Sequence, residues 1–203
     1  MIIDEIRYIL PNNNFVETEA TKKQIILGST FNHDMRHYIG WLNRYNGEFK
    51  RTASFTISLD GSIHQHFNPK FYSRYLNNKE IDPKTIVILL ENDGWLLKII
   101  ENNGFYTWTG DIYNKSIDVI EKKWRGYSYW APYSDKQFES LVSLVNKLCE
   151  EFSIPKTAIG HNTKVDDLKD YEGVLYKSNL DKQYTDLSPA FNFEGFKNKI
   201  EQI

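Results

Sequence analysis

The chain has 203 residues, of which 40% are hydrophobic and 15% aromatic, and its 25 basic and 27 acidic side chains leave a net charge of −2. This length and composition supply a core for one domain and exclude extended disorder. The near-neutral charge gives no electrostatic reason to expect nucleic-acid or membrane binding, and no apolar run approaches the roughly 20 residues that span a bilayer. Cys149 is the only cysteine, which excludes an internal disulfide and a cysteine-based zinc cluster. The N-terminus lacks the pattern of a signal peptide, so we expect a cytoplasmic protein in the producing cell.

The first half of the chain has the patterns of several regular elements. Residues 23–30 form a short apolar run that predicts a buried strand, and residues 85–90 form a β-branched run that predicts a strand covered on both faces. Apolar residues with helical spacing predict a helix at 34–45. Alternation in 53–58 and 62–67 around an Asp-Gly turn predicts a β-hairpin.

The stretch from 92 to 132 is aromatic and irregular, and it predicts an insertion at about 96–130. Strand-like pieces lie at 105–108 and 117–120, but no periodicity fixes how the rest folds. The aromatic rings suit the core of a small subdomain or stacking on sugar rings or bases.

The C-terminal part begins with the most regular helix of the chain. Its capping box is Ser134-Asp-Lys-Gln137, and the helical spacing of apolar residues continues to Pro155. A short strand at 157–161, a polar loop at 162–184 and a closing helix at 193–200 follow. Because helices and strands are interleaved, we predict a single α/β domain over the whole chain, with a mixed central β-sheet flanked by helices.

His161 ends the strand expected at 157–161. A histidine there is held rigidly at the edge of the sheet, where ligands and catalytic groups are usually mounted. The alternative is a histidine that only makes a hydrogen bond at a strand end. Asp186 lies beyond a loop that could return it to the same edge, although a turn residue before Pro189 is the simpler interpretation.

Other candidates for chemistry are weaker. His64 and His66 share one face of the expected hairpin and would suit a metal if a third ligand met them, but a solvated face is the favoured interpretation for His64. His33 and His37 are four apart on the expected helix and lack the glutamate of the HExxH pattern. Glu91 follows a core strand and could act as an acid or base or be a turn carboxylate.

In their order, these elements resemble the zinc-dependent N-acetylmuramoyl-L-alanine amidases of the phage-lysozyme type, which share their fold with the peptidoglycan-recognition proteins. The resemblance covers roughly residues 23 to 200, apart from the insertion. The matching pieces are the strand 24–30, the hairpin 55–63 (FTISLDGSI), the strand 85–92 (TIVILLEN), the capping box with Tyr133, Ile154-Pro155, Ile159-Gly160-His161, and Thr185-Asp186 with Pro189. The resemblance implies a shallow groove above one edge of the sheet.

The resemblance also implies a zinc site. In that family, zinc is held by a histidine at the end of the first strand, by the histidine of the Gly-His motif and by a cysteine, aspartate or histidine in the C-terminal loop. These positions fall at Gly28 or a neighbour in Leu27-Gly-Ser-Thr30, at His161 and at Asp186. Glycine has no ligand atom, and shifting the register by one or two residues supplies no histidine. The expected substitute is His33 or His37.

One hypothesis is an active or weakly active peptidoglycan amidase of phage or bacterial origin. A catalytic zinc needs about three protein ligands, so that the pKa of a bound water falls to roughly 7. That water would attack the amide between the muramyl lactyl group and L-alanine, with Glu91 or Tyr184 assisting proton transfer. Ser29, Thr30 and Asn162, beside the expected ligands, would contact the substrate.

The second hypothesis is a pseudo-amidase that has lost the metal site and binds the cell wall or builds part of a phage particle. The missing strand-end histidine favours it, whereas the retained His161 and Asp186 favour turnover. On both hypotheses the partner is peptidoglycan or a muropeptide, phage structural proteins are further partners, and the protein is virion-associated or acts on the host cell wall. A nucleic-acid-binding domain using Lys122-Lys-Trp-Arg125 is a distant third reading.

Overall fold

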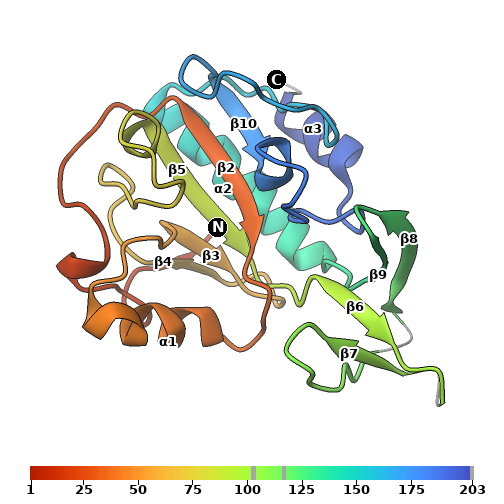
Figure 1. Ribbon diagram of the computed structural model, residues 1–203. Coiled ribbons are helices and arrows are strands. Elements are labelled where there is room, and N and C mark those ends of the chain that lie inside the picture. The colour runs from red at the N-terminus through yellow and green to blue at the C-terminus, as the bar shows by residue number, and fades with distance from the viewer. Residues whose placement is uncertain (102–103, 116–117, 202–203) are drawn as a thin grey trace.

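The computed structural model describes residues 1–101, 104–115 and 118–201 (Figure 1). The strands of the larger sheet are β1 (Ile3–Asp4), β2 (Gln24–Ser29), β3 (Phe55–Ile57), β4 (Ile63–Gln65), β5 (Thr85–Leu90) and β10 (Gly173–Tyr176). They are ordered β1-β4-β3-β5-β2-β10. The β3–β4 hairpin pairs antiparallel and the other neighbours pair parallel. This mixed sheet with flanking helices confirms the predicted fold class.

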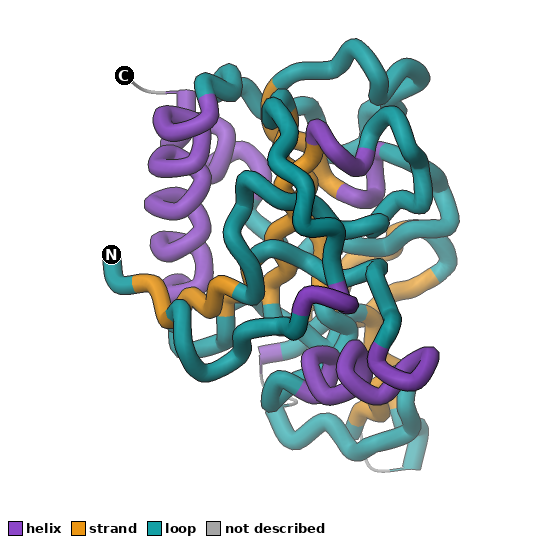
Figure 2. Tube along the Cα trace, turned by 90° about the vertical axis from the view of Figure 1, so that its left-hand side faces the viewer, coloured by secondary structure: helices purple, strands orange, loops and turns teal. Residues whose placement is uncertain are grey.

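Helices cover both faces of this sheet. The helices are α1 (Arg36–Asn43), α2 (Asp135–Phe152) and α3 (Phe193–Glu201), with 3-10 turns η1 (Asn12–Asn14), η2 (Arg44–Gly47), η3 (Asp82–Lys84) and η5 (Lys177–Asn179). Figure 2 shows α2 and α3 together on one side of the strands and α1 on the other. Within the described ranges, no helix is long and apolar enough to cross a membrane.

The central strand β5 is buried on both faces, as its continuous apolar pattern predicts. Ile86, Ile88 and Leu90 pack in the core beneath α2 and α3. Val87 and Leu89, which alternate with them, pack in a second core that includes residues of α1. Because successive side chains of a strand point to opposite faces, one apolar run serves two cores.

Helix α2 begins at the predicted capping box. The Ser134 hydroxyl accepts a hydrogen bond from the backbone N–H of Gln137 at 3.0 Å, and the Gln137 side chain accepts one from the N–H of Ser134 at 3.3 Å. The same glutamine donates to the carbonyls of Ile57 at 3.0 Å and Glu91 at 2.8 Å. The cap therefore also fixes α2 to the ends of β3 and β5.

The aromatic insertion forms a second, antiparallel sheet. Its strands, ordered β7-β6-β9-β8, are β6 (Trp95–Lys98), β7 (Phe105–Thr107), β8 (Ile120–Trp124) and β9 (Tyr127–Trp130). β7 confirms the strand-like piece at 105–108. The piece expected at 117–120 meets β8 only at residue 120, and residue 117 lies outside the described residues. Trp95 stacks on Tyr127 with ring centroids 4.5 Å apart, so part of the aromatic content builds this subdomain.

Sequence patterns misplaced some elements of the C-terminal part. The segment 162–184, expected as a polar loop, contains β10, a fully buried strand paired with β2. Only three consecutive apolar residues interrupt the polar sequence there, so its pattern does not indicate a strand. The strand expected at 157–161 is reduced to one bridge, between Ala158 and Val174. The helix expected at 34–45 begins at Arg36 because Met35 has left-handed backbone angles.

Candidate functional site

The end of β2 is covered by a carboxylate and a phenol. Oδ2 of Asp186 accepts a hydrogen bond from the backbone N–H of Ser29 at 3.1 Å. A Cβ atom on Gly28 would stand 2.8 Å from that oxygen and 3.0 Å from Oη of Tyr75. The space that a side chain at position 28 would need is therefore filled, and this is the position at which the resemblance places a histidine ligand.

Lys177 supplies the positive charge beside Asp186. Its Nζ atom lies 3.8 Å from Oδ2 of Asp186, and it packs over the rings of Tyr75 and Tyr184 at 5.1 Å and 4.9 Å from their centroids. Burial raises the pKa of Asp186, while Lys177 and the Ser29 N–H act in the opposite direction. Burial alone would lower the pKa of Lys177, but Tyr75 and Asp186 outweigh it and raise this pKa, so Lys177 stays charged.

The ring of His161 packs between two aromatic rings. It stacks on Phe193 with centroids 3.7 Å apart and lies under Trp124 at 4.6 Å. Its Nε2 atom is buried and has no hydrogen-bond partner within the described part of the chain. Burial lowers the pKa of His161 to about 4, so the ring is neutral at pH 7.

The β8–β9 hairpin of the insertion covers His161. Arg125, at the tip of this hairpin, donates to the backbone carbonyls of Ser178 and Asp181, each at 2.8 Å, and to that of Tyr184. Three hydrogen bonds from one guanidinium join the insertion to the loop that carries Lys177 and leads to Asp186.

The residues expected to contact substrate make hydrogen bonds within the protein. The hydroxyls of Ser29 and Tyr133 lie 2.8 Å apart, and Ser29 is buried. The Thr30 hydroxyl donates to a backbone carbonyl in the following loop at 2.6 Å. Oδ1 of Asn162 accepts from the indole N–H of Trp124 at 2.9 Å.

The proposed acid–base groups and the substitute ligand lie in separate places. Glu91 is buried and accepts a backbone N–H from the β3–β4 turn at 3.2 Å. Tyr184 packs on Lys177. Nδ1 of His33 lies 2.8 Å from Oδ1 of Asp93, in a groove beside the insertion. The structure does not bring His33 to His161 and Asp186.

The residues present do not fit a catalytic zinc ion. Across residues 1–101, 104–115 and 118–201, no three His, Cys, Asp or Glu side chains are grouped so that they could hold a metal. No ion pair joins His161 to Asp186 there, and the carboxylate of Asp186 already faces an ammonium group. A catalytic zinc requires about three converging ligands, so we derive no step through a metal.

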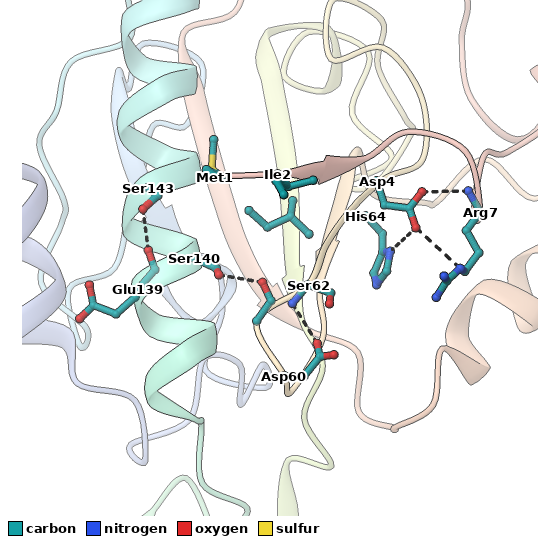
Figure 3. A pocket seen from close by; sticks show the side chains of 12 residues that line it. Met1, Ile2, Asp4, Arg7, Asp60, Ser62, His64, Glu139, Ser140 and Ser143 are labelled. Atoms are coloured by element: carbon teal, nitrogen blue, oxygen red, sulfur yellow. Dashed lines mark hydrogen bonds and ion pairs between the residues drawn. The ribbon is translucent and has the colours of Figure 1, made fainter.

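A different cavity, of about 710 Å³, opens at the β1 edge of the larger sheet (Figure 3). There Asp4 lies 3.4 Å from Nδ1 of His64 and 3.8 Å from Nε of Arg7. Neither His161 nor Asp186 lines this cavity, so it is not part of the candidate site.

Sequence reasoning missed Lys177 and Tyr75, and it named Arg125 only in the basic cluster of the nucleic-acid alternative. Each lies in a polar or irregular stretch whose spacing carries no periodic signal. Tyr133 belongs to a piece of the family resemblance, but nothing in the sequence indicated its contact with Ser29. The hydrogen bonds of Arg125 depend on the placement of the insertion, which no pattern predicted.

A comparison with solved structures places this chain in a known fold. It is similar to the N-acetylmuramoyl-L-alanine amidase LysC from Clostridium intestinale URNW, with a TM-score of 0.56, 14% identity, and coverage of 100% of this chain and 99% of that one. It is also similar to the amidase AmiD from E. coli in complex with anhydro-N-acetylmuramic acid-L-Ala-D-gamma-Glu-L-Lys, with a TM-score of 0.57, 12% identity, and coverage of 91% and 59%. A comparison with curated proteins gives no match.

The family itself follows from the sequence. Residues 18–172 match the family model described as N-acetylmuramoyl-L-alanine amidase, which is more than half of the chain. The protein belongs to this family, as the resemblance implied.

Proposed function

We propose that this protein is a pseudo-amidase that binds the peptide-bearing part of peptidoglycan and does not cleave it. The observation that carries the proposal is the filled space at Gly28, where the carboxylate of Asp186 and the phenol of Tyr75 lie in place of a ligand side chain. Lys177 supports it, because its ammonium already balances the charge of Asp186. Family membership supports peptidoglycan or a muropeptide as the partner.

The alternative is a zinc amidase that uses His161, Asp186 and His33. The neutral ring of His161 and its unpartnered Nε2 favour it. It requires His33 to leave Asp93. The first proposal needs no such rearrangement.

The structural neighbours include an endolysin from Clostridium intestinale URNW, with a TM-score of 0.56 and 13% identity over 100% of this chain and 97% of that one. A phage source and a place on the host cell wall or in a virion are therefore part of the proposal.

The test is to sediment the protein with insoluble peptidoglycan and to measure the new amino groups that cleavage at L-alanine would release. We expect the protein in the pellet and no amine release, with or without added Zn²⁺. Amine release that depends on Zn²⁺ would establish the alternative. Protein that stays in the supernatant would overturn the binding function.

A further inference from the structure

A cavity of about 450 Å³ opens beside the Lys177–Asp186 pair. Its walls come from the loop before β3, from the loop between β4 and β5, and from the segment around η5. Tyr75, Lys177 and Tyr184 line it, so the cavity reaches the ammonium group that balances Asp186. Its volume falls in the range of small-ligand sites, which is about 300–1,000 Å³.

The groups that face this cavity with unused capacity are mainly hydrogen-bond donors. Within the described part of the chain, the exposed guanidinium of Arg51 makes no hydrogen bond and no ion pair. The ammonium of Lys177, whose side chain is 23% exposed, has its carboxylate partner at 3.8 Å. Oδ1 of Asn78 accepts the backbone N–H groups of Glu80 and Ile81, at 2.9 Å and 3.3 Å, which leaves the NH₂ group of Asn78 to donate.

The nearby carboxylates are largely engaged by the protein. Of the described residues that line the cavity, Asp181 alone is acidic, and its Oδ1 accepts the backbone N–H of Gln183 at 2.9 Å. Asp82 and Asp186 are 3% and 1% exposed and accept backbone N–H groups. Two cations and the amides of Asn77, Asn78 and Gln183 therefore line the opening together with one exposed carboxylate.

We propose that this cavity binds a carboxylate group of the ligand, held by the guanidinium of Arg51 and the ammonium of Lys177. Arginine suits a carboxylate because its planar donors match the two oxygens. The inference rests on the proposed function and gives it a chemical class. A stem peptide with a γ-linked glutamate carries a free α-carboxylate, which is the anion that the cavity would take.

The direct test compares two muropeptides that differ only at this group. N-acetylmuramoyl-L-alanyl-γ-D-glutamyl-L-lysinamide presents the free α-carboxylate, and N-acetylmuramoyl-L-alanyl-D-isoglutaminyl-L-lysinamide presents the amide at the same carbon, with the γ-carboxyl group in a peptide bond in both. By titration calorimetry, we expect the acid to bind roughly tenfold more tightly than the amide, as the loss of a charge-assisted hydrogen bond implies. Glycerol phosphate, a model for phosphate-bearing wall polymers, should bind more weakly than the acid.

The variant Arg51→Gln should weaken binding of the acid more than binding of the amide, so that the preference for the acid falls to about twofold or less. Arg74→Gln is the matched control, because Arg74 is exposed and does not line the cavity. Equal binding of acid and amide by the unmodified protein, tighter binding of glycerol phosphate, or an Arg51→Gln variant that keeps the preference would overturn the carboxylate site and leave wall binding intact. Binding of neither muropeptide would overturn the site together with the proposed function.

Discussion

The carboxylate of Asp186 lies over Gly28, with Oδ2 at 2.8 Å from the point where a Cβ atom would stand. A retained candidate ligand thus fills the space of the missing one. The backbone N–H of Ser29 and the ammonium of Lys177 hold it there. The position at which the resemblance implies a strand-end histidine is therefore occupied by a hydrogen-bonded and charge-balanced polar cluster.

The first prediction concerns Gly28→Ala. The added methyl group meets Asp186, Tyr75 and Leu89 at 2.8 to 3.1 Å, and we expect a loss of about 1–3 kcal/mol in the free energy of unfolding in urea, as for an overpacked core. Gly40→Ala is the matched control, because the helix position is open and alanine should stabilise it by up to about 1 kcal/mol. An unchanged free energy of unfolding in Gly28→Ala would show that the side chains around Gly28 can move aside at little cost.

The second prediction concerns the Lys177–Asp186 pair. Lys177→Met leaves a buried carboxylate without its counter-charge, so we expect the free energy of unfolding, measured in denaturant, to fall by about 3 kcal/mol. Adding Asp186→Asn should restore part of that loss, which a double-mutant cycle measures. Lys147→Met, which breaks the exposed pair with Glu151, should cost less than about 0.5 kcal/mol. Additive effects of the two changes at 177 and 186 would contradict the coupling.

The third prediction concerns pH. The Thr56 hydroxyl lies 3.0 Å from Nε2 of His37 and 2.8 Å from Nε2 of His66, and Nδ1 of His66 donates to the carbonyl of Tyr8 at 2.8 Å. With His66 neutral, its Nε2 accepts from the Thr56 hydroxyl, which in turn accepts from the Nε2–H of His37, so protonation of His66 would break this chain. Burial lowers the pKa of His66 to about 4 and that of His37 to about 3.

Unfolded histidine titrates near 6.5, so the unfolded chain takes up protons first as the pH falls. Above about pH 6.5, these two rings do not change the free energy of unfolding. As the pH falls to 5, each ring should lower that free energy by about 2 kcal/mol, with a further loss towards pH 4. Urea unfolding at pH 7, 6 and 5 measures this slope, to which His161, with its pKa of about 4, adds a similar amount, so His66→Gln should remove about a third of it. A slope that His66→Gln does not change would mean that other groups cause the acid sensitivity.

The fourth prediction concerns Arg125. Arg125→Ala removes three hydrogen bonds to the loop at 178–184 and uncovers His161, so hydrogen exchange should quicken in this loop and in the β8–β9 hairpin. Arg36→Ala breaks an exposed ion pair with Asp111 and should leave the loop at 178–184 unchanged. Unchanged protection in Arg125→Ala would show that packing alone holds the hairpin.

Much of the larger sheet could be predicted, because its strands and α2 are local patterns. The two-sided burial of β5 and the Ser134 cap follow from side-chain spacing alone. β10 could not be predicted, since a strand of four residues takes its stability from pairing with β2 rather than from its own sequence. The candidate site was predicted only in part, because the place of Lys177 depends on contacts between distant segments.

The most direct test is the zinc content of the purified protein after supply of Zn²⁺ and dialysis, measured by plasma mass spectrometry. We expect less than about a tenth of an equivalent per chain and a melting temperature that a chelator does not change. About one equivalent per chain that is lost in His161→Ala, with a chelator-sensitive melting temperature, would contradict the central claim that Asp186 and Lys177 have closed the metal site.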